Sequence, residues 1–478
     1  MLLCVTDRDA FWRSVSRRCL NKLAGTAASL LLAATSFHSQ GQAAGDQTAN
    51  CIPRAGQAVE ITLEKAIRLA QASEPAYAAA KAASRSAALD KSIAVAGLLP
   101  NARFYNQDIY TQPNGLYAEG GEGVSSPNPK FVANDSRPRE YIAQGIVEET
   151  LGFAGPAAVR HADAAAAMAV AEQEIARRGL VATVTRMFYT SLAAGHKLVV
   201  AERARLEATE FTKQTTEREQ AREAAHADVV KAQLVEQQRE RDFEDAGVAD
   251  EKARLDLGVL LFSDPRTPYT LQAPALSPLP SQQEVEQAAA KNNPELKSAL
   301  ASLAASNADV QSAWGALLPS AVLNVTYGID ANEFAANGPL LNPDGLRARN
   351  LGYSTSVTVN LPVWDWLAGE HKLKQSQIRR DAAQVALTNM QRRMVAELEE
   401  AYDEARSAQD QLQSLDQSVA TAEESLRLTK LRYSAGEGTV LEVVDAETAY
   451  VTAEDAREDG RVRYETARAE LATIAGTM

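Results

Sequence analysis

The sequence predicts an α+β membrane protein in which long coiled-coil helices are combined with a transmembrane β-barrel that several chains share. Three observations carry this prediction. The run 370–432 contains neither proline nor glycine, and a helix of that length would extend about 95 Å at 1.5 Å per residue. Four other segments have strand-like patterns and are about 9–13 residues long, enough to cross a bilayer when tilted. The same order of elements also occurs twice along the chain, which predicts two internal repeats.

The repeat is visible in the register of short motifs. Pro75 and Pro100 are 25 residues apart, and so are Pro294 and Pro319, each pair ending in the same Leu-Leu-Pro. Later, DVVKAQ at 228–233 aligns with EVVDAE at 442–447, an offset of 214 residues. Two halves of about 200 residues therefore share one plan, namely a helix, two strands, a long helix and a further helix.

The N-terminal residues 1–43 are predicted to be a signal peptide. A basic segment with Arg17, Arg18 and Lys22 precedes an apolar stretch at 23–37 that is too short to cross a membrane, and small residues indicate cleavage near Ala43. A retained anchor is the alternative, which the short apolar stretch disfavours.

Cysteine usage is compatible with export. Cys4 and Cys19 lie in the signal, so Cys51 alone remains and no intrachain disulfide can form. Lipidation of Cys51 is an alternative fate, although the preceding Thr-Ala-Asn is a poor lipidation signal.

The domain boundaries follow from proline, glycine and hydrophobic periodicity. We expect a first repeat at 44–262, a proline-rich linker at 263–281 and a second repeat at 282–478. The expected helices are 61–99, 157–222, 227–261, 282–318, 370–432 and 440–475. The expected strands are 101–110, 139–151, 321–329 and 351–361, with glycine- and proline-rich loops at 111–138 and 330–349.

The strands at 321–329 and 351–361 carry mostly apolar residues at odd positions and small or polar residues between them. That alternation is typical of a barrel with a lipid face and a lumen face. Four strands cannot close a membrane barrel, and open edges are not tolerated in lipid, so several chains must contribute. A soluble sheet with one buried face is the alternative.

The run 370–432 carries a coiled-coil seam, because apolar residues recur at spacings of four and three. Its members are Met394, Leu398, Ala401, Ala405, Ala408, Leu412, Leu415, Val419, Ala422 and Leu426. An ordinary cytosolic coiled coil would explain this seam but neither the signal peptide nor the interposed strands. The formal net charge of −13 argues against nucleic acid as a partner.

Motifs of the common enzyme classes are absent from the sequence, including GxSxG, Walker A, HExxH and CxxC. The histidines are scattered over separate segments, so a metal site is not expected. We therefore predict a protein that is not an enzyme and that uses no cofactor and no metal.

The stretch Tyr433–Ala446 interrupts the longest helical run and is predicted to be the tip of a helical hairpin. Gly436 and Gly438 permit the reversal, because glycine adopts positive φ without steric penalty. Glu442 and Asp445 are three residues apart and therefore lie on one face of the outgoing helix. A solvated turn with ordinary surface charges is the alternative reading.

Two tryptophans, Trp364 and Trp366, flank Asp365 just after the last strand. They are predicted to form an interfacial aromatic belt where the barrel meets the helices. Simple packing at a hinge is the alternative.

The chain resembles the TolC-type outer membrane efflux proteins over roughly residues 58–476. The resemblance rests on four features: the related helices LEKAIRLAQASEPAY and VEQAAAKNNPELKSA, the leucine-proline helix ends, NLPVWDW with Gly369, and RYSAGEGTVLEVVDAETAY. The last block is the most specific.

The resemblance implies a homotrimer in which each chain gives four strands to an outer-membrane barrel and its helices to a periplasmic coiled-coil barrel. The protein would lie in outer membrane lipid, extend into the periplasm and have loops 112–138 and 330–349 outside the cell. The linker Ser263–Ser281 and the termini would form an equatorial belt.

By the same resemblance, the helical tips would contact a periplasmic adaptor and a proton-driven or ATP-driven inner-membrane pump. The protein would be the passive exit duct of a tripartite efflux or type I secretion system for small molecules or proteins. A soluble periplasmic coiled-coil adaptor or scaffold is the alternative function.

In the best-known member of this family, the block matching Tyr433–Ala446 closes the periplasmic entrance with a tyrosine, an arginine and two aspartates. Tyr433, Glu442 and Asp445 occupy matching positions, whereas Gly438 stands at the arginine position. We therefore expect an acidic ring of Glu442 and Asp445 at the aperture, with raised carboxyl pKa values and affinity for cations.

The first repeat offers its own charged groups near the corresponding tip. Arg218, Arg222 and Lys231 are the available cations, and Asp228 is the counterpart of Glu442. Asp228 and Lys231 are therefore included among the expected aperture residues.

Overall fold

The computed structural model describes residues 59–110, 139–276, 278–341 and 345–477. The predicted signal peptide, Cys51 and the loop 111–138 lie outside the described residues. The first-half elements are β1 (Val59–Ile61), α2 (Leu63–Ser73), α3 (Pro75–Ala96), β2 (Asn101–Tyr110), β3 (Arg139–Leu151), α4 (Ala154–Gln220) and α5 (His226–Leu261). The remaining elements are β4 (Tyr269–Leu271), α6 (Gln282–Asn292), α7 (Pro294–Gly315), β5 (Ser320–Ala331), β6 (Asn337–Leu340), β7 (Arg347–Arg349), β8 (Leu351–Asn360), α8 (Ala368–Ser434) and α9 (Val440–Ala475).

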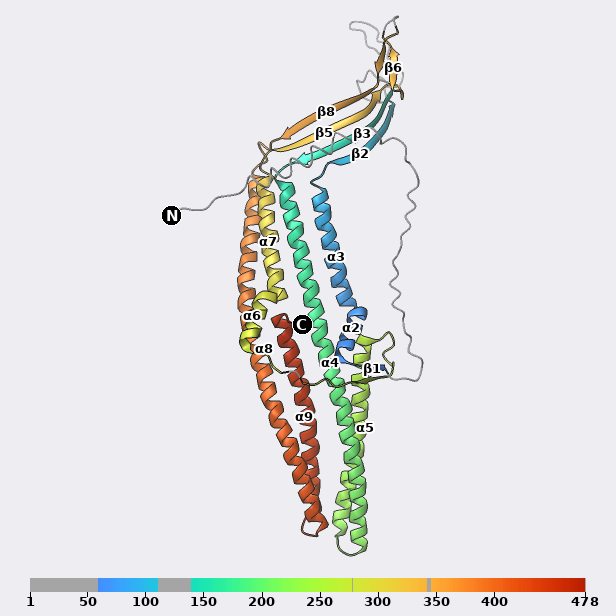
Figure 1. Cartoon of the computed structure of the whole chain (residues 1–478), viewed down its shortest axis with the longest axis vertical. Helices are drawn as coiled ribbons and strands as arrows, with labels where there is room; N and C mark the ends of the chain where they lie inside the picture. The colour runs from blue at the N-terminus through green and yellow to red at the C-terminus, as the bar shows by residue number, and fades with distance from the viewer. Residues whose placement is uncertain (1–58, 111–138, 277, 342–344, 478) are drawn as a thin grey trace, which may run out of the picture. The chain divides into compact units, whose positions relative to one another are not determined.

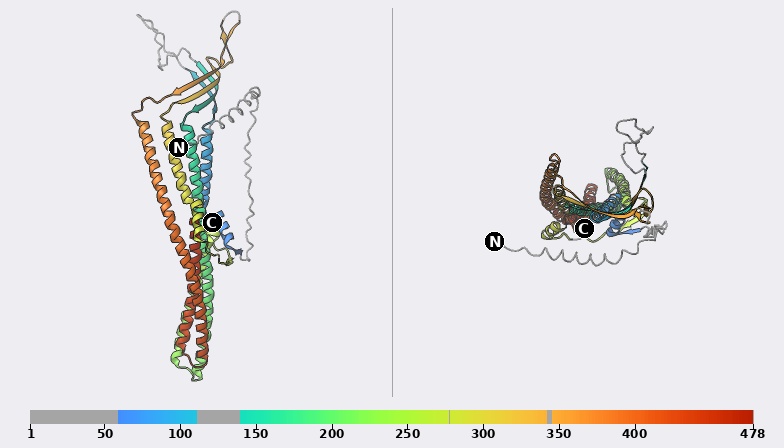
Figure 2. Two further views of the ribbon diagram at one scale, coloured as in Figure 1. Left: turned by 60° about the vertical axis from the view of Figure 1, so that its left-hand side comes forward. Right: turned by 90° about the horizontal axis from the view of Figure 1, so that it is seen from above.

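The helices of the two halves match in length. Helices α2 and α6 have 11 residues each, α3 and α7 have 22, α4 and α8 have 67, and α5 and α9 have 36. Helices α3, α4, α7 and α8 lie side by side in that order, and α5 and α9 fold back along α4 and α8 (Figure 1). The turns of both hairpins lie at the end of the helices away from the sheet (Figure 2).

The predicted single helices at 61–99 and 282–318 are wrong, because each is broken in two. Glu74 and Asn293, the residues before Pro75 and Pro294, have ψ values of 116° and 121°. A residue that precedes proline is pushed out of the helical region by the proline ring. Each proline then begins a new helix, where its missing N–H costs nothing. Each break in the helices is therefore predictable from the proline in the sequence.

The main sheet is antiparallel with the strand order β2-β3-β5-β8. The predicted strands 101–110 and 139–151 are confirmed at those bounds, and the two later strands differ from prediction by at most two residues at an end. The expected loop 330–349 contains a small hairpin, β6 and β7, that the sequence analysis missed.

The large apolar side chains of β5 and β8 project mostly from one face of this sheet, which also carries Asn106, Asp108, Glu149 and Thr355. Leu323 pairs with Val357 and Tyr327 with Tyr353, and residues directly opposite one another project from the same face. The alternation predicted from the sequence is therefore in register across strands. The exposed large apolar side chains of this face are Phe104, Tyr110, Val147, Leu151, Tyr327, Leu351, Tyr353, Val357 and Val359.

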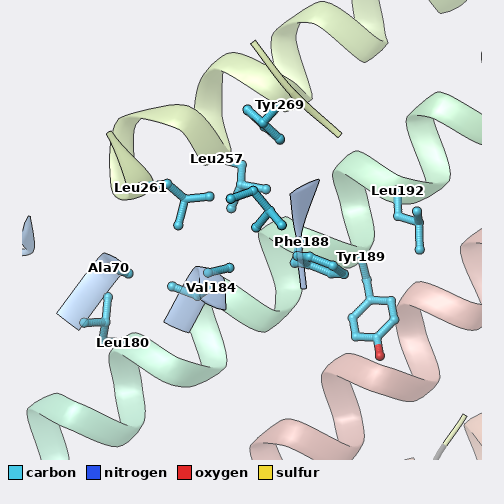
Figure 3. Close-up of a cluster of buried hydrophobic side chains, with 11 residues drawn as sticks. Ala70, Leu180, Val184, Phe188, Tyr189, Leu192, Leu257, Leu261 and Tyr269 are labelled. Carbon is cyan, nitrogen blue, oxygen red and sulfur yellow. The ribbon is translucent and has the colours of Figure 1, made fainter. Parts of the chain in front are cut away.

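A second, parallel sheet joins the start of the described chain to the linker, because β1 pairs with β4. It covers the largest buried cluster, in which Phe188 of α4 and Leu257 of α5 are fully buried (Figure 3). Tyr269 of β4 closes the cluster, and its hydroxyl donates to the Arg254 carbonyl oxygen at 2.8 Å. The predicted linker is thus tied to both helices of the first hairpin.

The predicted seam of α8 is confirmed. Six of its ten members are buried, namely Leu398, Ala405, Ala408, Leu412, Val419 and Leu426, and the other four are partly buried. Gly460 of α9 faces this seam, and a Cβ there would lie 2.5 Å from Leu415 Cδ1. None of the described helices is both long enough and apolar enough to cross a membrane.

Candidate functional site at the helical turns

The two hairpin turns have the same backbone geometry. After α4, Glu223 N donates to Arg218 O at 2.8 Å, and after α8, Glu437 N donates to Arg432 O at 2.9 Å. The residue before each donor is left-handed, Arg222 with φ 64° and Gly436 with φ 79°. This is the hydrogen-bond pattern that commonly ends a helix at a left-handed residue.

Glycine is needed at the second turn for two different reasons. Gly436 has positive φ and open space around its Cα, so conformation alone favours glycine there. Gly438 instead approaches the end of α8, and an added Cβ would lie 3.1 Å from Tyr433 N. An arginine at position 438 would therefore require the turn to shift.

We expect Arg222→Gly to stabilise the first turn and Gly436→Ala to destabilise the second, by about 1 kcal/mol each. The measurement is amide hydrogen exchange at Glu223 and Glu437 in the detergent-extracted protein. Each change should alter local exchange about fivefold, in opposite directions. Equal effects in the same direction would contradict the role of positive φ.

Tyr433 lies inside the packing of this chain and joins the two hairpins. Only 9% of the residue is exposed. Its ring lies 5.2 Å from that of Phe211, and its hydroxyl is 3.3 Å from Thr215 Oγ1. Both partners belong to α4. Tyr433, which the sequence predicts at the aperture, therefore connects α8 to α4 within the single chain.

Arg218 completes this contact. Its Nη1 donates to Tyr433 O at 2.9 Å and its Nη2 to Ser434 O at 3.2 Å. The guanidinium also lies 4.7 Å from the centre of the Tyr433 ring. A cation here satisfies carbonyl groups at the end of α8 and interacts favourably with the helix dipole.

Glu442 is paired with a cation that the sequence analysis overlooked. Arg432 Nη1 lies 3.3 Å from Glu442 Oε2, an ion-pair distance without hydrogen-bond geometry, and both side chains are about half exposed. Glu442 N in turn donates to the N-cap Thr439 at 3.3 Å. Asp445 is exposed one turn further along α9. Glu442 therefore has a cationic neighbour within its own chain, although position 438 is glycine.

The remaining expected aperture residues lie on α5. Asp228 Oδ2 accepts from Ala225 N at 3.4 Å and caps the start of the helix. Lys231 is partly buried on the next turn. Among the described residues, no hydrogen bond or ion pair joins Asp228 or Lys231 to Glu442 or Asp445. The structure therefore does not bring these two pairs together within one chain.

A cavity of about 580 Å³ lies between α4 and α8 behind the turns. Its charged lining is mainly acidic, with four carboxylates and two cations: Glu207, Glu210, Glu217, Glu223, Arg218 and Lys430. Lys430 Nζ pairs with Glu207 Oε2 at 2.5 Å and so links α8 to α4. The two hairpins are therefore held together by polar contacts on both sides of Tyr433.

Four buried glutamates lie along one face of α9, the helix that packs against α4. They are separated by seven, four and seven residues. They are Glu447, Glu454, Glu458 and Glu465. This heptad-like spacing at core positions was visible in the sequence, but the sequence analysis did not use it.

Glu458 is the best partnered across the interface. His196 Nδ1 of α4 lies 3.1 Å from Glu458 Oε2, and Arg457 Nη2 lies 3.0 Å from Oε1. Burial acts to raise the pKa of the Glu458 carboxyl, but the bonds to His196 and Arg457 outweigh it and the pKa is lowered.

Trp364 and Trp366 lie between β8 and α8 and contact each other edge-to-face, with ring centres 5.6 Å apart. Both are largely exposed, 70% and 82%. Asp365 between them accepts from Gly369 N at 2.7 Å and so caps the start of α8. Neither ring is buried within this chain, so the interfacial belt stays a prediction and hinge packing is disfavoured.

In the described ranges, no group of three or more His, Cys, Asp or Glu side chains is arranged to hold a metal.

Comparison with known proteins adds sequence and structural relatives. Residues 285–477 match the family model described as outer membrane efflux protein. Over 168 residues, 34% of this chain, the sequence is 29% identical to the pyoverdine export outer membrane protein OpmQ of Pseudomonas putida. That match spans about a third of the relative, 32% of its length.

Solved structures match over most of the chain. The CmeC outer membrane channel of Campylobacter jejuni has a TM-score of 0.70 at 16% identity, covering 87% of this chain and 85% of that one. The open state of the Neisseria gonorrhoeae MtrE outer membrane channel has a TM-score of 0.69 at 19% identity, covering 87% and 88%. VceC of Vibrio cholerae has 0.69 at 16%, covering 87% and 96%. Identities this low support the fold alone.

Proposed function

Because residues 285–477 carry an outer membrane efflux protein domain and the chain has the fold of outer membrane channels, we propose that it is the outer-membrane exit channel of a tripartite efflux system. These matches confirm the resemblance to TolC-type proteins that the motifs indicated. In this proposal three chains assemble, the sheet crosses the outer membrane, and the helices form a tunnel in the periplasm. Transport is passive, and an inner-membrane pump acting through a periplasmic adaptor supplies the energy.

The observation that carries the proposal is the set of exposed apolar side chains on one face of the β2-β3-β5-β8 sheet. Val357 is 65% exposed and Tyr353 is 83% exposed in the single chain, whereas soluble proteins rarely leave a large contiguous apolar patch uncovered. Strands β2 and β8 are the two edges of the sheet. An open edge is not tolerated in lipid, so edge-to-edge closure with further copies follows.

Three copies would place twelve strands in one barrel, and the lipid-facing side would be the face that carries Tyr353 and Val357. The 36-residue arms of α5 and α9 would extend about 54 Å from the linker region. That length projects the turns away from the membrane, where an adaptor could reach them. The exposed apolar sheet disfavours the alternative of a soluble adaptor or scaffold.

The two-repeat organisation belongs to this proposal. The four pairs of equal helix lengths and the shared turn geometry support a duplication of 44–262 as 282–478, joined by 263–281. Each repeat then gives one strand pair to the barrel and one helical hairpin to the tunnel.

For the cargo we propose a small molecule, because the curated relative is named for the export of pyoverdine. Export of a protein through a type I system is the second candidate. The tunnel would serve either role, so the discriminating observation is the size of the molecule that accumulates inside cells lacking the protein.

The ion pair of Glu442 changes the proposed acidic ring at the aperture. Glu442 is partly neutralised by Arg432 at 3.3 Å, whereas no ion pair joins Asp445 to another described residue. Asp445 is therefore proposed as the main acidic group facing its copies in the trimer.

We expect Asp445→Ala to weaken block by divalent cations more than Glu442→Ala does. The measurement is single-channel conductance of the purified protein with and without a divalent cation. The physical reason is that only an unpaired carboxylate leaves its full charge available at the aperture. Unchanged cation block in Asp445→Ala would sink the acidic ring.

Membrane fractionation tests the function itself. We expect the protein in the outer membrane fraction, extracted only by detergent and with the native mass of three chains. A monomer in the soluble periplasmic fraction would overturn the proposal and favour the adaptor.

A further inference from the structure

Glu447 is a buried carboxylate that the proposed channel function does not use. It lies on α9, about two turns after the N-cap Thr439, and is 3% exposed. Its Oε1 has no hydrogen-bond partner among the described residues. A buried charge without its full set of partners is costly in a helix interface, so this position calls for a physical explanation.

Charged groups surround Glu447 from three neighbouring helices. Helix α4 contributes Arg203 and Glu207, which line the same small space beside Glu447. Helix α5 contributes Arg239, and α8 contributes Lys430. On α9 itself, Tyr450 lines that space.

Of the cations near Glu447, Lys430 and the terminal nitrogens of Arg239 bind other groups, while Arg239 Nε is buried with no hydrogen-bond partner among the described residues. Lys430 pairs with Glu207 at 2.5 Å. Arg239 donates to Thr448 Oγ1 at 3.0 Å and pairs with Asp242 at 3.3 Å. The Glu447 carboxylate therefore receives only part of the compensation that a buried charge needs.

We propose that Glu447 is a proton-sensitive latch, in which its buried charge weakens the packing of α9 against α4 and α5 near the turns and uptake of a proton strengthens that packing. Burial raises the pKa of the Glu447 carboxyl above its ordinary 4.5, an effect that Arg239 and Lys430 only partly offset. The folded state therefore binds the proton more tightly than the unfolded state does. The packing free energy improves as the pH falls through the raised pKa and levels off below about 4.5.

The consequence for a channel rests on the function proposed above. Glu207 connects the latch to the contact that joins the hairpins, because it lines both the small space beside Glu447 and the cavity that Arg218 and Tyr433 line. An acidic periplasm would then hold the turns together more firmly, and a neutral one would let them separate more easily.

Hydrogen exchange over residues 443–451 of the detergent-extracted full-length protein tests the latch. After correction for intrinsic exchange rates, wild-type protection should rise about fivefold from pH 7.5 to pH 5.5. Glu447→Gln should show the higher protection at both pH values. A Glu447→Gln protein that keeps the full pH dependence, or that is less protected than wild type at pH 7.5, would overturn the proposal.

Two control variants make the result specific. Glu470→Gln removes an exposed carboxylate from the same helix and should behave as wild type. Glu454→Gln removes a buried carboxylate that is bound by Arg457 at 2.6 Å and Tyr450 at 3.1 Å, and it should lower protection. Increased protection in Glu454→Gln would mean that any amide on this face has the effect and would contradict the latch. The exchange measurement needs no ion conduction, so its failure leaves the proposed function standing, and a non-conducting protein leaves this test valid.

Discussion

Replacing Arg218 with alanine is expected to free the α8–α9 hairpin from α4 and to raise the conductance of the channel. The substitution removes two hydrogen bonds to the carbonyl groups of Tyr433 and Ser434, and the cation over the Tyr433 ring. Hydrogen bonds from charged groups contribute about 1.5–3 kcal/mol and the ring contact about 0.5–1 kcal/mol. Because one of the two hydrogen bonds is exposed to solvent and such contributions are not additive, we expect a total loss of about 2–3 kcal/mol, enough to shift an open–closed equilibrium by more than tenfold.

Single-channel recording measures this effect. We expect Arg218→Ala to be open for a much larger fraction of time than wild type. Arg218→Lys should be intermediate, because lysine keeps the charge but cannot contact both carbonyls in the planar geometry of arginine.

Lys213→Ala serves as the matched control, since Lys213 is an exposed cation on the same helix. Wild-type gating in Arg218→Ala, or equal opening in Lys213→Ala, would mean that the contact between α4 and α8 does not hold the turns closed.

Replacing Val357 with lysine is expected to abolish assembly into the outer membrane. Val357 lies within β8 and pairs with Leu323 of β5, so both side chains project from the same face of the sheet. A lysine on the lipid face near the bilayer midplane costs about 2–4 kcal/mol per chain, and three chains would bear that cost in one barrel. The measurement is the amount of detergent-extractable trimer in the outer membrane, which should fall at least tenfold.

The neighbouring Ser356→Lys is the control for this experiment. Successive residues of a strand point to opposite faces, so this lysine would lie on the lumen side. We expect trimer levels close to wild type. Equal loss in both variants would indicate a sheet that is not in lipid, and retention of both would do the same.

Much of the fold can be predicted from the sequence, because the residues that end its helices and strands are clearly placed. Proline and glycine bound the strands, and the helix lengths follow from long runs without either residue. At Pro75 two signals in the sequence conflict, because continuous hydrophobic periodicity predicts one helix whereas the restriction on the residue before proline predicts a break, and the restriction prevails. The hairpin β6–β7 was missed because glycine and proline also occur in loops.

The candidate site was less readable, because its contacts join residues far apart in the chain. Tyr433 and Arg218 are 215 residues apart, and no local pattern states that their helices are neighbours. The sequence predicts that Tyr433 and Arg218 each lie near the tip of a helical hairpin. Only the contacts between α8 and α4 show that Tyr433 is buried. The pairing of Arg432 with Glu442 is not predicted by a local pattern either, because the two residues meet only when the chain reverses at the turn.

We propose that this chain forms a channel whose pore is closed at the helical turns. The most direct test is single-channel recording of the purified trimer in a planar lipid bilayer, with wild type and Arg218→Ala compared at one pH. We expect discrete conductance steps from both proteins, with rare openings in wild type and frequent openings in Arg218→Ala. Stable insertion of either protein without any conductance step would contradict this proposal.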